Sequence, residues 1–193
     1  MGRMPDPADS DELLLRRYAR GDASAFAALY RRHETRIWRY LERNTGNRAS
    51  AEELMQEVWF AVAREAGRYQ PSARFTTWLF TIARNRMIDA GRLGRRQVSL
   101  DALGYDAPPV IQQLTAAAAG APLAATIRIQ QGAALAQALA QLPAEQREAF
   151  LLHIEAELSV EEVAAVTGST FETTKSRLRY ARAKLRELLS EHA

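Results

Sequence analysis

The sequence predicts an all-α protein made of two small helical bundles joined by a flexible linker. Apolar residues recur at helical spacing in two blocks, residues 10–98 and residues 130–193. Residues 99–129 between them contain several Pro and Gly residues and no sustained amphipathic repeat, which is typical of a linker; an alanine run there allows a short helix. No segment has the two-residue alternation of a strand. Residues 1–9 are expected to be disordered.

The first block opens with capped amphipathic helices. Ser10 is expected to cap the first helix, and Asp22 the second, after a break at Gly21. Residues 44–47 form the next break, and Ser50 with Glu53 three residues later has the spacing of a capping box. The predicted apolar sides of these helices consist of Leu13, Leu14, Leu15, Tyr18, Phe26, Leu29, Tyr30, Ile37, Trp38, Leu41, Leu54, Val58, Ala61 and Val62.

A loop and a basic helix complete the first block. Residues 67–74 contain Gly and Pro and are expected to form the loop, and a helix is expected over residues 76–92. Trp78, Leu79 and Ile82 of this helix are expected in the core.

The second block is expected to hold four helices that end in a helix-turn-helix. Leu135, Leu139 and Leu142 line the first of them, and Phe150, Leu151 and Ile154 line the next. Ser159 and Glu162 have capping-box spacing before a short apolar helix, and Gly168 stands where a left-handed residue ends a helix. A helix follows that carries Lys175, Arg177, Arg179, Arg182, Lys184 and Arg186. A short capped helix, a glycine turn and a basic helix indicate binding to the DNA major groove, whereas a basic helix alone would be read as a solvated face.

Charge is unevenly distributed along the 193 residues. The formal net charge is +3, but residues 74–96 contain six Arg against Asp89, and residues 145–162 contain six Glu against Arg147. These blocks suggest two basic surfaces that face DNA and acidic surfaces turned elsewhere. The absence of cysteine excludes disulfides and thiolate zinc sites, and no apolar run has the length of a signal peptide core or a membrane span, so a soluble, cytoplasmic protein is expected.

Four stretches in order resemble the extracytoplasmic-function (ECF) class of bacterial RNA polymerase sigma factors, in the sigma-70 family. They are residues 26–33, residues 51–60, residues 75–89 and residues 142–150. The resemblance implies sigma region 2 over the first block, a linker, and sigma region 4 with its helix-turn-helix over the second. It implies a protein that binds core RNA polymerase and starts transcription at specific promoters, by reading their −35 element and melting their −10 element.

The resemblance also implies the contacts with polymerase and regulators. Glu52, Glu53, Gln56 and Glu57 lie on one side of a helix, opposite Leu54 and Val58, and such an acidic face can pair with Arg and Lys of a partner. The family docks this helix on the clamp helices of the largest polymerase subunit. The flap of the polymerase and an anti-sigma factor are further implied partners.

Two sets of residues are implied to contact promoter DNA. Aromatic rings and cations suit the capture of an extruded base, and the −10 set is Tyr69, Gln70, Arg74, Arg84, Asn85 and Arg86. The −35 set is Thr173, Thr174, Lys175, Ser176, Arg177, Arg179 and Arg182. Lys175, Ser176 and Arg179 occupy the base-reading positions, while the other four are expected at phosphates. Glu172-Thr173-Thr174 departs from the Gly-Thr-Val that is frequent in the family.

Two other functions compete with this interpretation. A free-standing regulator that binds an operator would explain the second block but leaves residues 51–60 and 75–89 without a role. An enzyme is the weakest hypothesis: His33-Glu34 lacks the second histidine of a zinc-binding HExxH motif, and His153 lies among apolar residues, which suits a structural role. No catalytic residue, metal site or cofactor is expected.

Overall fold

The computed structural model describes residues 6, 8–70, 73–101 and 123–190, with backbone alone at residues 93–101 and 123–131. These residues form eight α-helices, a short 3-10 helix at Ala66–Arg68 and no strand, which confirms the predicted all-α class. The α-helices are α1 (Asp11–Ala19), α2 (Ala23–Thr45), α3 (Arg48–Glu65), α4 (Phe75–Asp101), α5 (Leu123–Ala140), α6 (Ala144–Ile154), α7 (Val160–Thr167) and α8 (Phe171–Ser190). None of the helices in the described part is both long and apolar enough to cross a membrane.

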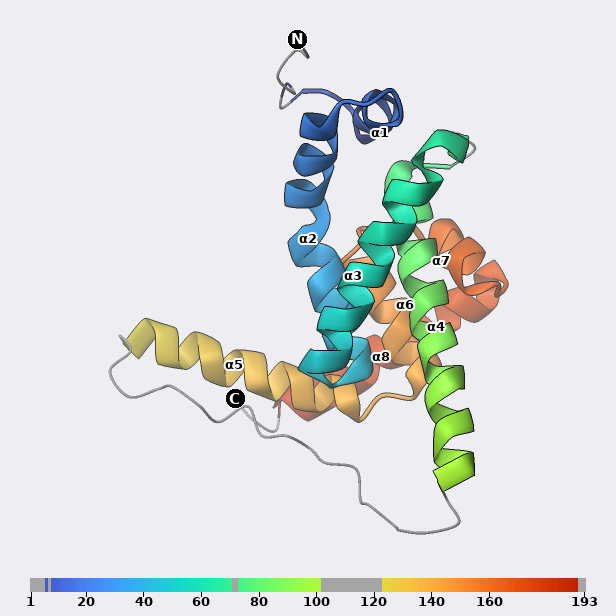
Figure 1. Cartoon of the computed structure of the whole chain (residues 1–193). Helices are drawn as coiled ribbons and strands as arrows, with labels where there is room; N and C mark the ends of the chain where they lie inside the picture. Colours follow the sequence, from blue (N-terminus) through green and yellow to red (C-terminus); the bar gives the residue numbers. More distant parts are fainter. Residues whose placement is uncertain (1–5, 7, 71–72, 102–122, 191–193) are drawn as a thin grey trace.

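Helices α1–α4 form the N-terminal unit, in which α2, α3 and α4 lie beside one another and α1 packs against α2 (Figure 1). Most of the predicted apolar positions are buried. The fully buried side chains include Leu14, Leu15, Leu29, Ile37, Tyr40, Leu41, Phe75, Leu79 and Phe80. Leu13 and Tyr30 were expected in this core but are exposed, because both stand at the edge of their apolar stripe.

Polar contacts fix α1 to α2 and to the start of α4. The Asp11 carboxylate accepts from Arg32 (2.9 Å) and lies 2.7 Å from Nε2 of the buried His33. The Phe75 N–H donates to Glu12 Oε1 (3.0 Å) across the unit. Burial acts to raise the pKa of Glu12, but this N–H and other hydrogen bonds outweigh it and hold that pKa below its ordinary value. Helix α1 thereby positions the first turn of α4.

The caps of α1 and α2 are confirmed, and the predicted cap of α3 is wrong. Ser10 accepts from the Leu13 N–H, and Asp22 accepts from the Ser24 N–H. Helix α3 begins at Arg48, with Asn47 as the N-cap in an extended conformation that accepts from the Ser50 N–H. Asparagine caps a helix as well as serine does, and its earlier position places Ser50 inside the first turn.

The two ends of the predicted linker are helical. Helix α4 continues to Asp101, past the expected end at Arg92, and α5 begins at Leu123. Residues 102–122 of the linker, like residues 1–5 and 7 of the predicted N-terminal disorder, lie outside the described residues. Asp9, within the expected disordered terminus, pairs with Arg17 at 2.8 Å.

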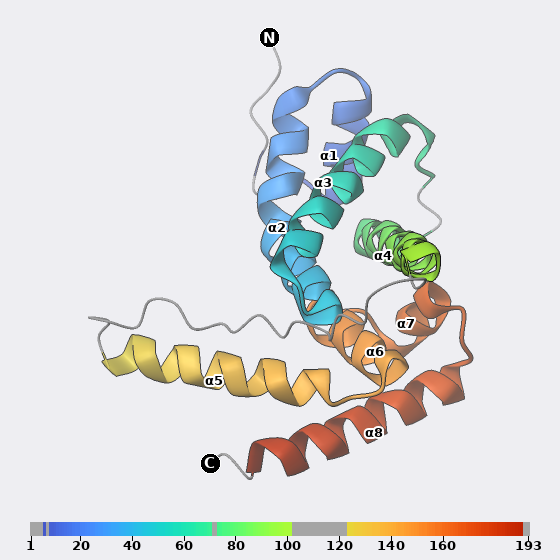
Figure 2. The ribbon, with the colours of Figure 1, turned by 60° about the horizontal axis from the view of Figure 1, so that its bottom comes forward.

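Helices α5–α8 form the C-terminal unit, in which α5 lies along α8 (Figure 2). The capping box at α7 is confirmed: Ser159 Oγ accepts from the Glu162 N–H (3.2 Å), and the Ser159 N–H donates to Glu162 Oε2 (2.9 Å). Gly168 has φ +65° and ends α7 in the left-handed region, as expected for the turn before α8. Ile154, expected in the core of this unit, is exposed at the last turn of α6.

We expect Ser159→Ala to lower the free energy of unfolding by about 1 kcal/mol, because it removes the acceptor that caps α7. Urea denaturation followed by circular dichroism measures this loss. Ser159→Asp retains an acceptor and serves as the matched control. An unchanged unfolding midpoint in Ser159→Ala would contradict a stabilising role for the cap.

The two units touch along one boundary. Helix α6 packs against α2, and α7 packs against α4 near the start of the latter. The acidic segment between residues 148 and 162 therefore faces the N-terminal unit, which corrects the expectation that the acidic surface is turned away from the basic one.

Candidate nucleic-acid and polymerase interfaces

Helix α3 presents the predicted acidic face to solvent. Glu52, Glu53, Gln56 and Glu57 are all exposed, while Leu54 and Val58 on the opposite side are buried. Phe60 continues the exposed side, and 74% of its surface is accessible. The face therefore combines carboxylates with one large apolar ring. Sequence reasoning missed Phe60, although its spacing of three residues from Glu57 was a signal.

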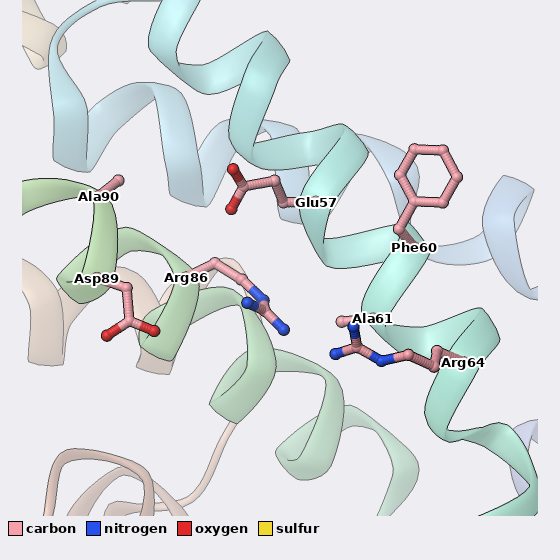
Figure 3. Close-up of a pocket in the computed structure, with 7 residues that line it drawn as sticks. All are labelled: Glu57, Phe60, Ala61, Arg64, Arg86, Asp89 and Ala90. Carbon is pink, nitrogen blue, oxygen red and sulfur yellow. The ribbon is translucent and has the colours of Figure 1, made fainter. Parts of the chain in front are cut away.

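A hollow of about 360 Å³ separates this face from α4, and Glu57, Phe60 and Arg86 lie on its walls (Figure 3). A second hollow of about 230 Å³ is lined by Ile82, Asn85 and Arg86. Arg86 belongs to both hollows, so the polymerase candidates on α3 and two of the −10 candidates on α4 share one surface. Both hollows are open to solvent, which suits a solvent-accessible contact rather than an enclosed small-molecule site.

The loop side of the −10 set is held by aromatic packing. Tyr69 is half-buried, and its ring centroid lies 5.0 Å from that of Trp78 and 6.5 Å from that of Phe75. Its hydroxyl donates to the Ala73 carbonyl oxygen (2.9 Å), and burial raises the pKa of Tyr69. Gln70 is exposed beside it. Leu79 and Ile82 are buried and Trp78 packs against the core, which confirms their predicted positions.

The remaining −10 candidates face the C-terminal unit. Arg84 Nε donates to Glu148 Oε1 at 3.0 Å, and Arg74 lies 3.4 Å from Glu162 Oε2. The Thr77 hydroxyl donates to Glu162 Oε1 at 2.8 Å. Burial acts to raise the pKa of Glu162, but hydrogen bonds from Ser159, Thr77 and Arg74 hold that pKa below its ordinary value. The structure thus turns Arg74 and Arg84 toward the C-terminal unit and leaves Asn85 and Arg86 at the hollows beside α4.

Helix α8 displays most of the −35 candidates on its outer side. Thr173, Lys175, Arg179 and Arg182 are exposed, and Ser176 is half-buried. The Arg179 guanidinium lies 4.9 Å from the Tyr180 ring centroid and donates to the Tyr180 hydroxyl (3.1 Å). The Lys175 ammonium lies 5.9 Å from the Phe171 ring centroid. These two exposed rings orient the basic side chains, and sequence reasoning did not single them out.

Arg177 is half-buried and forms an ion pair with Glu145 of α6, so a phosphate would have to compete with a carboxylate for it.

Thr174 is not available to DNA, which corrects its place in the −35 set. Its side chain is fully buried, and its Oγ1 lies 2.7 Å from Ser169 Oγ. Its backbone N–H donates to the Thr170 carbonyl oxygen (2.9 Å). Both groups through which it could have reached a phosphate stabilise the turn between α7 and α8 instead.

The histidines of the described part take structural positions. His33 binds Asp11, and His153 Nδ1 lies 2.8 Å from the Leu158 carbonyl oxygen, which confirms the structural role expected of His153. Among the described residues, no three His, Cys, Asp or Glu side chains are grouped closely enough to hold a metal ion.

Comparison with known proteins identifies both units. The family model of sigma-70 region 2 matches residues 29–97, and that of sigma-70 region 4 matches residues 132–185. The RNA polymerase sigma factor CarQ of Myxococcus xanthus is 34% identical over 92% of this chain and 96% of its own. The ECF RNA polymerase sigma factor RpoE of Cereibacter sphaeroides is 34% identical over 97% of this chain and 100% of its own.

A solved structure agrees with these matches. The sigma factor RpoE of Bartonella quintana, in complex with the anti-sigma factor NepR, superimposes with a TM-score of 0.68 at 27% identity, over 86% of this chain and 96% of its own. Two family matches in the expected order and full-length relatives above 30% identity settle the question of family. The chain belongs to the ECF class of the sigma-70 family of RNA polymerase sigma factors.

Proposed function

We propose that this chain binds core RNA polymerase and directs it to promoters, by reading the −35 element with α8 and melting the −10 element with α4. The observation that carries the proposal is the presence of three exposed contact regions on one chain, the first two of which adjoin at Arg86. These are the acidic face of α3, the hollow with Asn85 and Arg86 beside it, and the basic outer side of α8. A polymerase, a melted strand and a duplex each require one such surface.

The acidic face serves as the polymerase contact. Glu52, Glu53, Gln56 and Glu57 would pair with basic side chains of the clamp helices, and Phe60 would bury its ring in the same contact. Charge complementarity of this kind sets orientation and association rate, while a buried aromatic ring supplies affinity. The C-terminal unit would contact the flap of the polymerase.

The hollow beside α4 serves as the site for an extruded −10 base. Asn85 offers both a donor and an acceptor for a base edge, and Arg86 offers a cation for the adjoining phosphate. We propose that the Tyr69 ring, which packs against Trp78 and Phe75, and the exposed Gln70 contact the −10 element from the loop before α4. Base capture of this kind offsets the unstacking cost of melting, which is a few kcal/mol.

Lys175, Ser176 and Arg179 read base edges in the major groove, and Thr173, Arg177 and Arg182 hold phosphates. The alternative, a free-standing operator-binding regulator, leaves the exposed acidic face of α3 without a partner. The polymerase performs the chemistry, so the chain itself is not an enzyme, and it acts in the cytoplasm with the chromosome. Because the Bartonella relative is in complex with an anti-sigma factor, we propose a partner of the same kind here.

Transcription in vitro tests the function directly. Purified chain and purified core polymerase are incubated with a library of genomic promoter fragments, and the transcripts are sequenced. We expect products that depend on the chain and share a −35 and a −10 sequence. Failure to bind core polymerase, together with specific binding of duplex DNA by the chain alone, would favour the operator-binding regulator.

We expect Arg179→Ala to weaken binding by about 1–3 kcal/mol at one base position, because we propose that this guanidinium, which lies over the Tyr180 ring, reads a base edge. Gel-shift titrations over altered −35 sequences, with the assembled holoenzyme, measure the effect. Arg186→Ala removes the same charge from an exposed position further along α8 and is the matched control. Equal weakening on every sequence would assign Arg179 to a phosphate instead.

A further inference from the structure

We propose that Glu12 of α1 is a positioning residue for promoter melting: it holds the first turn of α4, and through that turn the loop that the proposed function assigns to the −10 element. The part that concerns melting rests on the proposed function. Helix α1 precedes residues 29–97, which match the region 2 family, and it carries none of the residues assigned to polymerase or DNA. Those contacts therefore leave α1 without a role.

The first turn of α4 receives its capping group from a distant part of the chain. Helix α4 begins at Phe75, and the residue before it is Arg74, whose guanidinium has donors but no acceptor. The first N–H groups of a helix need acceptors from outside the helix. Glu12 supplies one, because its Oε1 accepts the Phe75 N–H at 3.0 Å. A carboxylate at this place also interacts favourably with the positive end of the helix dipole.

Contacts between α1 and α2 hold Glu12 in place. The neighbouring Asp11 carboxylate accepts from Arg32 at 2.9 Å and lies 2.7 Å from Nε2 of the buried His33. Arg32 also donates to the Asp9 carbonyl oxygen at 2.7 Å, just before α1 begins. The N-terminus of α1 cannot move relative to α2 without breaking these hydrogen bonds to a charged side chain, which are among the stronger ones in proteins. Glu12 therefore links the start of α4 to a fixed position on α2.

The Phe75 ring extends this restraint into the loop before α4. Its centroid lies 5.3 Å from that of His33 on α2, 6.5 Å from that of Tyr69 and 5.8 Å from that of Trp78. The Tyr69 hydroxyl donates to the Ala73 carbonyl oxygen at 2.9 Å, which ties the two ends of the loop together. A shift of Phe75 would therefore displace Tyr69 as well.

Helix α1 also lies against the other end of the loop. It packs on the 3-10 helix Ala66–Arg68, which leads directly into Tyr69. Burial raises the pKa of Tyr69, the nearby Glu12 carboxylate raises it further, and the Arg16 guanidinium lowers it. The charges of α1 therefore act on the Tyr69 hydroxyl, and α1 faces both ends of the segment that carries Tyr69 and Gln70.

The position of α4 decides whether the proposed −10 site is assembled. Groups that capture an extruded base must be held within about 0.5 Å of their productive positions. Tyr69 and Gln70 lie in the loop, and Asn85 lies further along α4, so loss of Glu12 is expected to displace both parts of the site together. The acidic face of α3 and the basic side of α8 lie on other helices. Core binding and binding of the −35 duplex are therefore expected to be independent of Glu12.

Promoter opening by holoenzyme that contains the full chain tests this role. A promoter found by transcription in vitro, with 2-aminopurine in its −10 element, reports melting by fluorescence. Anisotropy measures binding of the chain to core polymerase and of the holoenzyme to an upstream −35 duplex. We expect Glu12→Ala to lower the ratio of open to closed complexes about tenfold, or about 1.4 kcal/mol, with both affinities unchanged. Glu12→Gln keeps an acceptor for the Phe75 N–H and is expected to restore most of the opening.

Asn47→Ala is the matched control, because it removes the side chain that caps α3 in the same unit. Urea denaturation is expected to show similar losses of stability in Asn47→Ala and Glu12→Ala, whereas only Glu12→Ala is expected to impair opening. Opening by Glu12→Ala at the level of the unmodified chain would overturn the proposal. An equal loss of opening in Asn47→Ala would overturn it too, since the effect would then follow stability alone.

Hydrogen exchange of the chain alone separates this inference from the proposed function. We expect Glu12→Ala to remove the protection of the Phe75 N–H and to leave the protection of α8 unchanged. Unchanged exchange at Phe75 would overturn the positioning role. If holoenzyme with the unmodified chain opens no promoter, the proposed function fails and the role in melting fails with it, while exchange at Phe75 still decides whether Glu12 holds α4.

Discussion

Reversal of two charges on α3, Glu53→Lys/Glu57→Lys, is expected to abolish transcription by this chain with core polymerase. Both carboxylates are exposed on the same side of the helix, so the reversal turns an attractive face into a repulsive one without disturbing the core. Like charges across an interface cost several kcal/mol, and every 1.4 kcal/mol is about tenfold in affinity. We therefore expect a loss of core binding of about 100-fold or more, measured by fluorescence anisotropy with labelled chain and by run-off transcription.

The control for this reversal is Glu161→Lys/Glu187→Lys, which makes the same change of net charge on the C-terminal unit at exposed positions. It is expected to bind core polymerase as the unmodified chain does. Circular dichroism should give the same helix content for all three proteins. Retained core binding in Glu53→Lys/Glu57→Lys would remove α3 from the polymerase contact.

The largest effect on stability is expected for Phe80→Ala. Phe80 is fully buried in α4, and its ring meets that of Tyr40 edge to face, with centroids 5.3 Å apart. Its removal sacrifices apolar burial and leaves a cavity, which together cost about 3–5 kcal/mol for a buried phenylalanine. Because a domain of this size is stable by about 5–15 kcal/mol, much of that margin would be lost. Urea denaturation measures the change in the free energy of unfolding.

Phe60→Ala is the matched comparison, since it makes the same substitution at an exposed position of the adjacent helix. Its free energy of unfolding is expected to change by no more than about 0.5 kcal/mol. A loss of stability in Phe60→Ala equal to that in Phe80→Ala would mean that Phe60 packs against the fold. If Phe80→Ala cost less than about 1 kcal/mol, the core around Tyr40 would be able to collapse into the space.

Local chemistry explains what could be predicted from the sequence. Ser10, Asp22, Ser159 and Gly168 act through groups within four residues of themselves, so their roles do not depend on the remainder of the fold. The cap of α3 was misplaced because two capping residues, Asn47 and Ser50, stand within four positions of each other. Helix α4 extends past Arg92 because nothing in the following residues stops it strongly.

Features that depend on how helices meet could not be predicted. Thr174 is buried because α8 crosses α7 at that turn, and no spacing along α8 alone distinguishes it from exposed Thr173. The direction of the acidic segment depends on the packing of α6 and α7 against the N-terminal unit. The basic block at residues 74–96 and the acidic block at residues 145–162 are visible in the sequence, and blocks of opposite charge attract each other. Their attraction was a signal that the two units pack together.

The Glu162 carboxylate makes two kinds of contact, one at the N-terminus of its own helix and one with the other unit. One oxygen accepts the Ser159 N–H and holds the first turn of α7, and the other accepts the Thr77 hydroxyl across the boundary between the units. Glutamine at position 162 could still accept the Ser159 N–H, but it has no charge to pair with Arg74. Aspartate is one methylene shorter and would not reach both Ser159 and Thr77. Substitution at position 162 is therefore more restricted than substitution of the neighbouring Glu161, which is exposed to solvent.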